Sequence, residues 1–394
     1  MDLFSDLPEP GDVSKPIRRD PPAKEISHRV VRAAADTLFA DLPSPSSNPQ
    51  LPQAATLAAA KRPHDAVDED NSQNKRPASS AFALHGFVAE RKGERDEMQD
   101  SHVIQDAFHA EIPHLHGSIR RLSYYGVFDG HNGCRASRHA AQYLHRHLAA
   151  RFPKGTSLPI LATLLHRHLA KPDGPKGDME HVEKEIKRSI MESFKKTDED
   201  FLRRAGSCKP SWKDGTTAVT VVAINNTLYI ANLGDSKAIL CRYSAATQKH
   251  ISVPLSKDHT PTEYAERMRI QKAGGHVRDG RVLGVLEVSR SIGDGQYKRC
   301  GVSCLPDVMR CQLTEADRFL VLACDGLWKV FTSDQVIAAV LSVLEDDSLV
   351  VEGDEKRLLE LRYEAACNKL VNEAVRKLSG DNVTVVIVHI ARDK

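Results

Sequence analysis

Aspartates placed at the ends of apolar runs are the residues of this sequence best suited to chemistry. A buried carboxylate must be paired, hydrogen-bonded or bound to a cation, because an isolated charge beside a core is strongly disfavoured. Carboxylates that converge on one place repel one another unless cations relieve them, and all-oxygen ligands select Mg²⁺ or Mn²⁺ over zinc. A single Asp-Gly pair is more often a turn, but four such placements in one chain favour a metal site. The four are Asp129, Asp235, Asp325 and Asp381.

Six short blocks around these aspartates carry a resemblance to a known family. In chain order they are Phe128–Gly133, Asp214–Ala218, Asn232–Ser236, Leu286–Asp294, Ala323–Trp328 and Gly380–Thr384. Their order and content resemble the signature blocks of the metal-dependent protein phosphatases of type 2C. The likeness extends over about residues 82–392, which is nearly all of the part expected to fold.

The resemblance implies a set of metal ligands. Asp129 would bridge two cations, Mg²⁺ or Mn²⁺, and the backbone carbonyl of Gly130 would bind the second of them. Asp325 and Asp381 would complete the first. Two cations about 3.5–4 Å apart can activate a water as nucleophile at neutral pH and neutralise charge developing on a phosphoryl group. No cysteine nucleophile is then required.

The resemblance also implies two residues that act on the substrate. Arg95 would hold the substrate phosphate, and His131 would protonate the departing Ser or Thr oxygen as a general acid. An alternative role for His131 is to orient its neighbours around the metals without transferring a proton.

Some residues depart from the family pattern. Gln99 stands where the family usually has Glu, which removes one negative charge and predicts weaker metal binding. Gln99 and its neighbour Asp100 are therefore weaker candidates near the metals. Asn132 replaces a Gly after His131, which is tolerable because Asn adopts positive φ more readily than most residues.

A lysine lies close to the expected site. Lys329 stands four residues after Asp325, where many members of the family have Asp. A cation there opposes the third metal that some members bind, either through repulsion or by pairing with Asp235, so Asp235 is a weaker candidate ligand. The alternative is that Lys329 points to solvent and contacts nothing.

Other chemistries fit the sequence poorly. Cys304 and Arg310 have the spacing of a cysteine-phosphatase loop, but Asp307 between them would repel a phosphate. Cys300, Cys304 and Cys311 lack the paired short spacings of a structural zinc site. The glycines at Gly293 and Gly295 follow no strand of the kind that opens a nucleotide-binding loop.

The elements that must position these residues are predicted from apolar periodicity and from turn residues. Strands are expected at 86–89, 122–128, 217–224, 228–232, 238–241, 319–323 and 383–390. Helices are expected at 135–152, 181–204, 261–273, 333–344 and 361–378, the third with Pro261 in its first turn. Residues 153–180 are expected to form a long surface excursion. Grouped strands and grouped helices favour an α+β fold, and the resemblance implies a four-layer αββα sandwich of two antiparallel sheets flanked by helices.

The first 80 residues differ in composition from the rest. They hold more than half of the chain's 20 prolines and no cysteine, so we expect residues 1–80 to be a disordered Pro/Ser/Ala-rich arm before a phosphatase domain at 82–392. Leu3–Pro8 is echoed at Leu38–Pro43, which fits either a duplicated docking peptide or chance. The basic pairs Lys61-Arg62 and Lys75-Arg76 fit a bipartite nuclear import signal or an ordinary charged linker.

Composition limits the compartment and the partners. The 394 residues carry a formal net charge of +2, which argues against bulk nucleic-acid or membrane-surface binding. No transmembrane run is present, the start is acidic where a signal peptide would be basic, and eight scattered cysteines are typical of reduced thiols. We therefore expect a cytoplasmic protein that also enters the nucleus if its basic pairs act as a signal.

Two functions from different classes remain. The first is an enzyme that hydrolyses phosphoserine and phosphothreonine on intracellular proteins. The second is a pseudophosphatase that binds phosphoproteins or a kinase without turning them over. The intact set of Asp129, Gly130, Asp325 and Asp381 favours the enzyme. By resemblance, a kinase-containing complex such as one with integrin-linked kinase is an expected partner, besides phosphoprotein substrates.

Overall fold

A computed structural model describes residues 82–112, 121–152, 176–346 and 354–392, which belong to one compact unit. The expected arm at 1–80, with its repeated hexapeptide and basic pairs, lies outside the described residues. Most of the expected excursion at 153–180 lies outside them as well. Residues 176–180 are already helical, so the prediction of an irregular segment was wrong for its last five residues.

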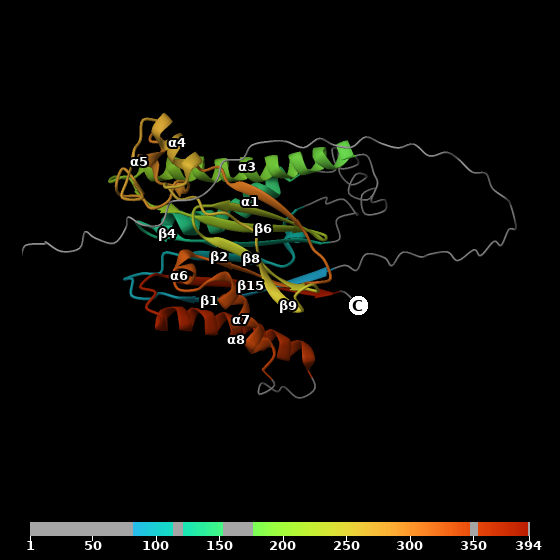
Figure 1. The fold of residues 1–394 in the computed structure, drawn as a ribbon. Helices are drawn as coiled ribbons and strands as arrows, with labels where there is room; N and C mark the ends of the chain where they lie inside the picture. Colours follow the sequence, from blue (N-terminus) through green and yellow to red (C-terminus); the bar gives the residue numbers. More distant parts are fainter. Residues whose placement is uncertain (1–81, 113–120, 153–175, 347–353, 393–394) are drawn as a thin grey trace, which may run out of the picture. The chain divides into compact units, whose positions relative to one another are not determined.

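The strands form two five-stranded antiparallel sheets and two small ones (Figure 1). The first sheet has the order β1-β15-β14-β8-β9, and the second has the order β13-β7-β6-β3-β2. The main strands are β1 (Phe82–Arg91), β2 (Ser101–Gln105), β3 (Leu122–Phe128), β6 (Ala218–Ile224), β7 (Thr227–Leu233), β8 (Lys237–Ser244), β9 (Lys249–Pro254), β13 (Asp307–Gln312), β14 (Asp317–Ala323) and β15 (Val383–Arg392). Short strands are β4 (Gly130–His131), β5 (Gly215–Thr216), β10 (Val277–Arg278), β11 (Arg281–Val282) and β12 (Ile292–Gly293).

Helices cover the outer face of each sheet, so the predicted α+β sandwich is confirmed (Figure 1). They are the 3-10 turn η1 (Phe108–Glu111) and α1 (Arg135–Arg151), α3 (Lys176–Ser207), α4 (Tyr264–Lys272), α5 (Gly295–Lys298), α6 (Asp325–Trp328), α7 (Ser333–Leu344) and α8 (Glu355–Arg376). One core joins α1 and α3 to the second sheet, and another joins α7 and α8 to the first. A third core fills the space between the sheets.

Most predicted elements are present, with differences at their ends. The predictions at 122–128, 135–152 and 333–344 correspond to β3, α1 and α7. The helix expected from Pro261 begins only at Tyr264, because a turn from Thr260 to Glu263 leaves Glu263 extended at ψ 135°. Pro261 therefore precedes α4 instead of lying in its first turn.

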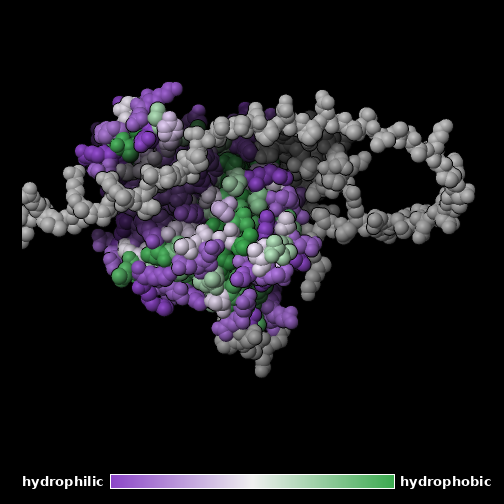
Figure 2. Space-filling model, viewed as in Figure 1, coloured by the Kyte–Doolittle hydropathy of each residue, from purple (hydrophilic) through white to green (hydrophobic). Residues whose placement is uncertain are grey.

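Hydrophobic residues gather along the face that carries β8 and β9 in the view of Figure 2. Two grooves lie on the open edges of the sandwich. One runs between β9 and α7 and includes the half-exposed Ile251, and the other borders β13 and includes Met309. The edge strands β9 and β13 are thus only partly covered by side chains of the described residues.

Strand register brings several chain ends to one end of the sandwich. Phe128 at the end of β3 pairs with Ser101 at the start of β2, and Arg91 at the end of β1 pairs with Val383 at the start of β15. The end of β14 lies beside the same start of β15. Residues that directly follow or precede these strands therefore meet at this end.

Candidate active site

A cleft of about 260 Å³ opens at this end of the sandwich. Eight of the nine residues singled out in the sequence line it: Arg95, Gln99, Asp129, Gly130, His131, Asp235, Asp325 and Asp381. The ninth, Asp100, lies behind Asp129 and is buried. Lys329 also lines the cleft, together with Val285, Leu286, Glu287 and Val288 from the segment that connects β9 to β13.

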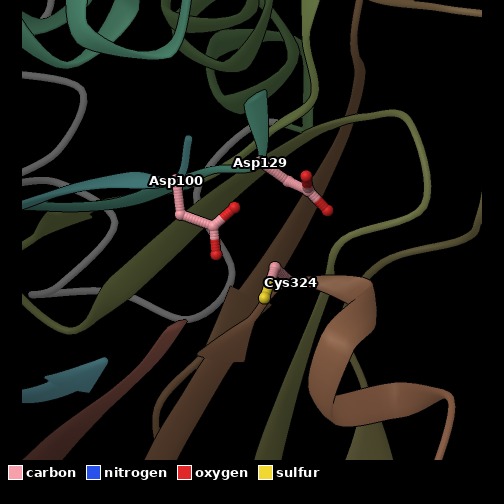
Figure 3. A group of neighbouring side chains, drawn as sticks. All are labelled: Asp100, Asp129 and Cys324. Carbon is pink, nitrogen blue, oxygen red and sulfur yellow. The ribbon is translucent and has the colours of Figure 1, made fainter. Parts of the chain in front are cut away.

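Asp129 lies at the centre of the carboxylates. It follows the fully buried strand β3, and its oxygens take part in two close groups whose ligand atoms all lie within 4.8 Å of one another. One group adds Asp235 and Asp325, and the other adds Asp100 and Cys324 (Figure 3). Asp129 is the member that the two groups share.

The carboxylates of this cluster are electrostatically strained. Burial, with Asp100 and Asp325 nearby, raises the pKa of Asp129 well above its usual value. Burial likewise raises the pKa of Asp100 to about 7, and burial with the Asp325 charge raises the pKa of Asp235 to about 7. Such shifts mean that the cluster disfavours its own negative charge and would be relieved by cations.

The available donor atoms fit a divalent cation that prefers oxygen. Oδ1 of Asp100 and Oδ1 of Asp325 are buried and have no hydrogen-bond partner within the part of the chain that the structure describes. The Cys324 thiol instead accepts from the amide of Thr384 at 3.1 Å, and burial raises its pKa well above normal. A neutral, engaged thiol is a poor ligand, so the donor set is carboxylate oxygen, which suits Mg²⁺ or Mn²⁺.

Asp381 lies beside two cationic side chains. Its Oδ2 is 3.0 Å from Nη2 of Arg95 and 3.0 Å from Nζ of Lys329. Nζ of Lys329 also lies 2.7 Å from Oδ2 of Asp325. Burial opposes the lysine charge, but Asp325 and Asp381 together raise the pKa of Lys329 above its ordinary value, so the ammonium stays charged.

The partners of Lys329 differ from those expected. Lys329 lies at the C-terminal end of α6, and its ion pairs are with Asp325 and Asp381 rather than with Asp235. The alternative of a lysine that points to solvent and contacts nothing was wrong.

The loop from β1 to β2 also lines the cleft, through Arg95 and Gln99. The Gln99 side-chain amide donates to Glu97 at 2.9 Å, and the Gln99 backbone amide donates to Asn382 at 2.7 Å. The backbone carbonyl of Gln99 approaches Gly130 so closely that a Cβ there would collide with it. Asp100 accepts a hydrogen bond from Thr384 at 2.7 Å. These contacts fix the loop against β4 and the start of β15.

His131 is held by a carboxylate that sequence reasoning missed. Its Nε2 lies 2.6 Å from Oδ2 of Asp294, which is fully buried and also accepts from Ser291 at 2.6 Å. Burial opposes protonation of the imidazole, but Asp294 raises the pKa of His131 above its ordinary 6.5. A Cβ at Gly215 would occupy the space where His131 and Asp294 meet, so glycine is required there.

The sequence contained an indication that Asp294 belongs to the site, because it is the last residue of the Leu286–Asp294 block and follows Gly293. In the structure Asp294 has a positive φ of 51°. Asn132, beside His131, also has a positive φ, 59°, as its residue type permits.

The cysteines form no alternative catalytic centre. All eight lie within described segments and are free thiols, as predicted. Burial raises the pKa of Cys304 to about 11, which is unsuited to a thiolate nucleophile, and Arg310 lies within β13, where its guanidinium donates to Gln312 at 3.3 Å. Among the helices that the structure describes, none has the length and apolar character needed to cross a membrane.

Comparisons with known proteins agree with this geometry. Residues 84–383 match the family described as Protein phosphatase 2C. A Bos taurus protein named integrin-linked kinase-associated serine/threonine phosphatase 2C is 49% identical over 99% of this chain and 100% of its own length, and the Homo sapiens protein of that name is 48% identical over the same shares. A solved serine-threonine phosphatase 2C from Toxoplasma gondii shares the fold with a TM-score of 0.61 at 20% identity, covering 79% of this chain and 95% of that one.

Proposed function

Because the chain belongs to the protein phosphatase 2C family, we propose that its central carboxylates hold the divalent cations on which members of this family depend. The chain is a serine/threonine protein phosphatase, a phosphoric monoester hydrolase. The observation that carries the proposal is the position of Asp129, which belongs to both close groups of ligand atoms and can therefore bridge two cations.

The other proposed ligands lie in the same cleft as Asp129. The Gly130 carbonyl would bind the second cation, and Asp325 and Asp381 would bind the first. Asp100 and Asp235, whose oxygens complete the two groups, are the additional candidates. When bound, Mg²⁺ or Mn²⁺ supplies an activated water and neutralises charge that develops on the phosphoryl group.

Arg95 and His131 act on the substrate. The Arg95 side chain is 55% exposed in the cleft and can exchange its contact with Asp381 for a substrate phosphate, which a guanidinium binds with two donors. Asp294 orients His131 and raises its pKa against the effect of burial, which favours an imidazole that can donate a proton to the departing Ser or Thr oxygen.

Two cations are favoured over three. A third would need the carboxylates of Asp235 and Asp325, but the Lys329 ammonium already lies 2.7 Å from Asp325. A fixed positive charge at that distance opposes a further cation.

The test is hydrolysis of a phosphothreonine peptide by the full chain with and without Mn²⁺. We expect turnover only with Mn²⁺ or Mg²⁺, and a loss of more than about 100-fold in Asp129→Asn, because a direct ligand contributes more than an outer-shell contact. Asp106→Asn is the matched control, since Oδ1 of Asp106 accepts hydrogen bonds from the Tyr125 hydroxyl and the Gly86 backbone amide outside the cleft. Wild-type turnover in excess chelator would contradict the proposal, and an inactive but phosphopeptide-binding chain would identify a pseudophosphatase.

The partners and compartment extend the proposal. We propose that residues 1–80 form an arm before the phosphatase domain at 82–392.

The names of two relatives of this chain state an association with integrin-linked kinase, and a complex containing that kinase is the partner proposed here. Cytoplasmic residence is proposed, with nuclear entry through the basic pairs Lys61-Arg62 and Lys75-Arg76. Co-precipitation with the kinase, and imaging of a fluorescent fusion with both pairs changed to alanine, test these points.

A further inference from the structure

Helix α3 contributes a buried carboxylate that no part of the proposed mechanism uses. Asp198 is 5% exposed, although it carries a group that is unfavourable to bury without partners. Its Oδ1 accepts from the backbone amide of Gly293 at 2.8 Å and lies 3.0 Å from Nζ of Lys298. Gly293 directly precedes Asp294, and Lys298 is the last residue of α5, the short helix that begins just after Asp294.

A continuous series of contacts joins this carboxylate to His131. Nζ of Lys298 donates to the backbone carbonyl of Ser291 at 2.7 Å. The Ser291 hydroxyl donates to Oδ2 of Asp294 at 2.6 Å, and the same oxygen lies 2.6 Å from Nε2 of His131. Asp198 is therefore four contacts away from the imidazole, with Lys298, Ser291 and Asp294 in between.

The turn needs such support because its backbone is strained. Gly293 has a φ of 87° and Asp294 a φ of 51°, and a non-glycine residue in the left-handed region persists only when its surroundings hold it. The amide of Asp294 donates to the carbonyl of Asp214 at 3.0 Å, which secures one side. Asp198 secures the other side through the amide of Gly293.

One face of α3 is fitted to this turn. Asp198, Phe201 and Leu202 are spaced i, i+3 and i+4, which places them on the same side of the helix. Phe201 reaches within 3.1 Å of where a Cβ of Gly293 would stand, and Leu202 within 3.1 Å of a Cβ at Gly295. The apolar contacts of Phe201 and Leu202 thus accompany the ion pair of Asp198 with Lys298.

We propose that Asp198 is a positioning residue for catalysis, which sets the Ser291–Asp294–His131 series from α3 and so aims the proton of His131 at the leaving oxygen. The proposal rests on the proposed function of His131 as proton donor. It assigns to α3, a helix that contributes no residue to the cleft, an indirect influence on the protonation step.

The test compares two substrates that differ in their need for a proton. p-Nitrophenyl phosphate has a leaving group that departs as an anion, whereas a phosphothreonine peptide must receive a proton. In Asp198→Asn at saturating Mn²⁺, we expect kcat for the peptide to fall about 10-fold or more, a part of the 10²–10⁴-fold that general acids contribute. We expect little change in KM, in Mn²⁺ affinity, or in turnover of p-nitrophenyl phosphate.

Two reference variants complete the experiment. His131→Ala reports the full leaving-group effect, and Asp200→Asn is the matched control, a carboxylate on the same helix that pairs with Lys196 and Arg203. If Asp198→Asn does not fold, Lys298→Met removes the same ion pair and serves in its place.

The outcomes separate the two proposals. If His131→Ala shows a leaving-group effect and Asp198→Asn shows none, or loses both substrates equally, the positioning role is wrong while the proposed function stands. If His131→Ala itself shows no leaving-group effect, the proton-donor role fails and the positioning role with it. An effect in Asp198→Asn that Asp200→Asn lacks supports the inference.

Discussion

Lys329 is the residue that most distinguishes the charge of this cleft from a purely acidic one. Its ammonium lies 2.7 Å from Asp325 and 3.0 Å from Asp381, two of the proposed ligands of one cation. A cation that binds there must compete with it for these oxygens. We therefore expect the lysine to raise the Mn²⁺ concentration that the protein needs.

We expect Lys329→Met to bind Mn²⁺ about 10-fold more tightly, within the range that outer-shell changes cause in metal affinity. Isothermal titration calorimetry measures this without substrate. Lys257→Met is the control, because Lys257 pairs with Glu263 outside the cleft. Lys329→Asp should in addition let a third cation bind, seen as anomalous density in Mn²⁺-soaked crystals. Equal affinity in wild type and Lys329→Met would refute the competition.

Gln99 is the second residue that lowers the negative charge of the cleft. Its amide donates to Glu97, a contact that a carboxylate at position 99 would replace with repulsion. In Gln99→Glu the new carboxylate should turn away from Glu97 toward the cations. We therefore expect the Mn²⁺ concentration for half-maximal rate to fall by about 10-fold. Gln99→Ala separates loss of the amide from gain of charge. A metal titration that is the same in Gln99→Glu and wild type would remove Gln99 from the site.

Besides the β1–β2 loop, the cleft is lined by part of the 255–306 segment between β9 and β13. This segment has its own small core, and Glu266 of α4 ties it together through Arg269, Arg290 and Ser289. Burial acts against the charge of Glu266, but the hydrogen bonds from Arg290 and its neighbours lower its pKa below the ordinary 4.5. A lowered folded-state pKa stabilises the segment above about pH 4.5, and this stabilisation is lost as the pH falls below that value.

Glu266→Gln should therefore weaken this segment at pH 7 by about 2 kcal/mol, the value of hydrogen bonds to a charged group. Hydrogen exchange at pH 7 should show faster exchange in residues 260–305 than in β3 or β14. In the wild type the same segment should lose protection first as the pH falls below 4.5. Uniform loss of protection across both sheets would contradict a local role.

How well elements could be predicted from the sequence depended on where each strand lies in its sheet. Central strands such as β3 and β14 are buried on both faces and appear as continuous apolar runs. Within the two five-stranded sheets, the strands that were missed, β2, β9 and β13, are all at sheet edges, where half-exposed polar residues hide the pattern. The two-residue strands of the small sheets, such as β5, were missed as well, because they are too short to show a period. Aspartates such as Asp129 could be singled out because the apolar strands before them could be predicted.

The rest of the site could not be predicted because it depends on contacts between distant segments. The pairing of Asp294 with His131 spans 163 residues, and no local period encodes it. The direction of the Lys329 side chain depends on Asp381, 52 residues away. Residue types at motif positions indicated the chemistry, whereas the hydrogen-bond and ion-pair partners of these residues could be identified only in the folded structure.

At the scale of the whole molecule, we expect the described domain to fold and to act without residues 1–80. Deleting residues 1–80 should leave its cores intact, because these cores are built from described residues between Phe82 and Ile390. We expect a melting temperature within about 2 °C of the full chain, since less than 1 kcal/mol is at stake. Hydrolysis of p-nitrophenyl phosphate should be unchanged.

Circular dichroism melts and steady-state rates of the two chains measure this. Deletion of residues 1–90, which removes most of β1, is the control that must unfold the domain. A melt of the 81–394 chain far below that of the full chain would show that the arm contributes to the core.

The pairing of β1 with β15 has a consequence for biosynthesis. Phe82 pairs with Arg392 and Arg95 contacts Asp381, so the cleft joins segments 286 residues apart. During translation the loop that carries Arg95 leaves the ribosome long before Asp381 has been made. Contacts of such high sequence separation form slowly, and a ribosome-bound chain that lacks β15 has neither a complete first sheet nor a complete cleft. We therefore expect the nascent protein to be inactive until β15 emerges, so that a partly made chain removes no phosphate.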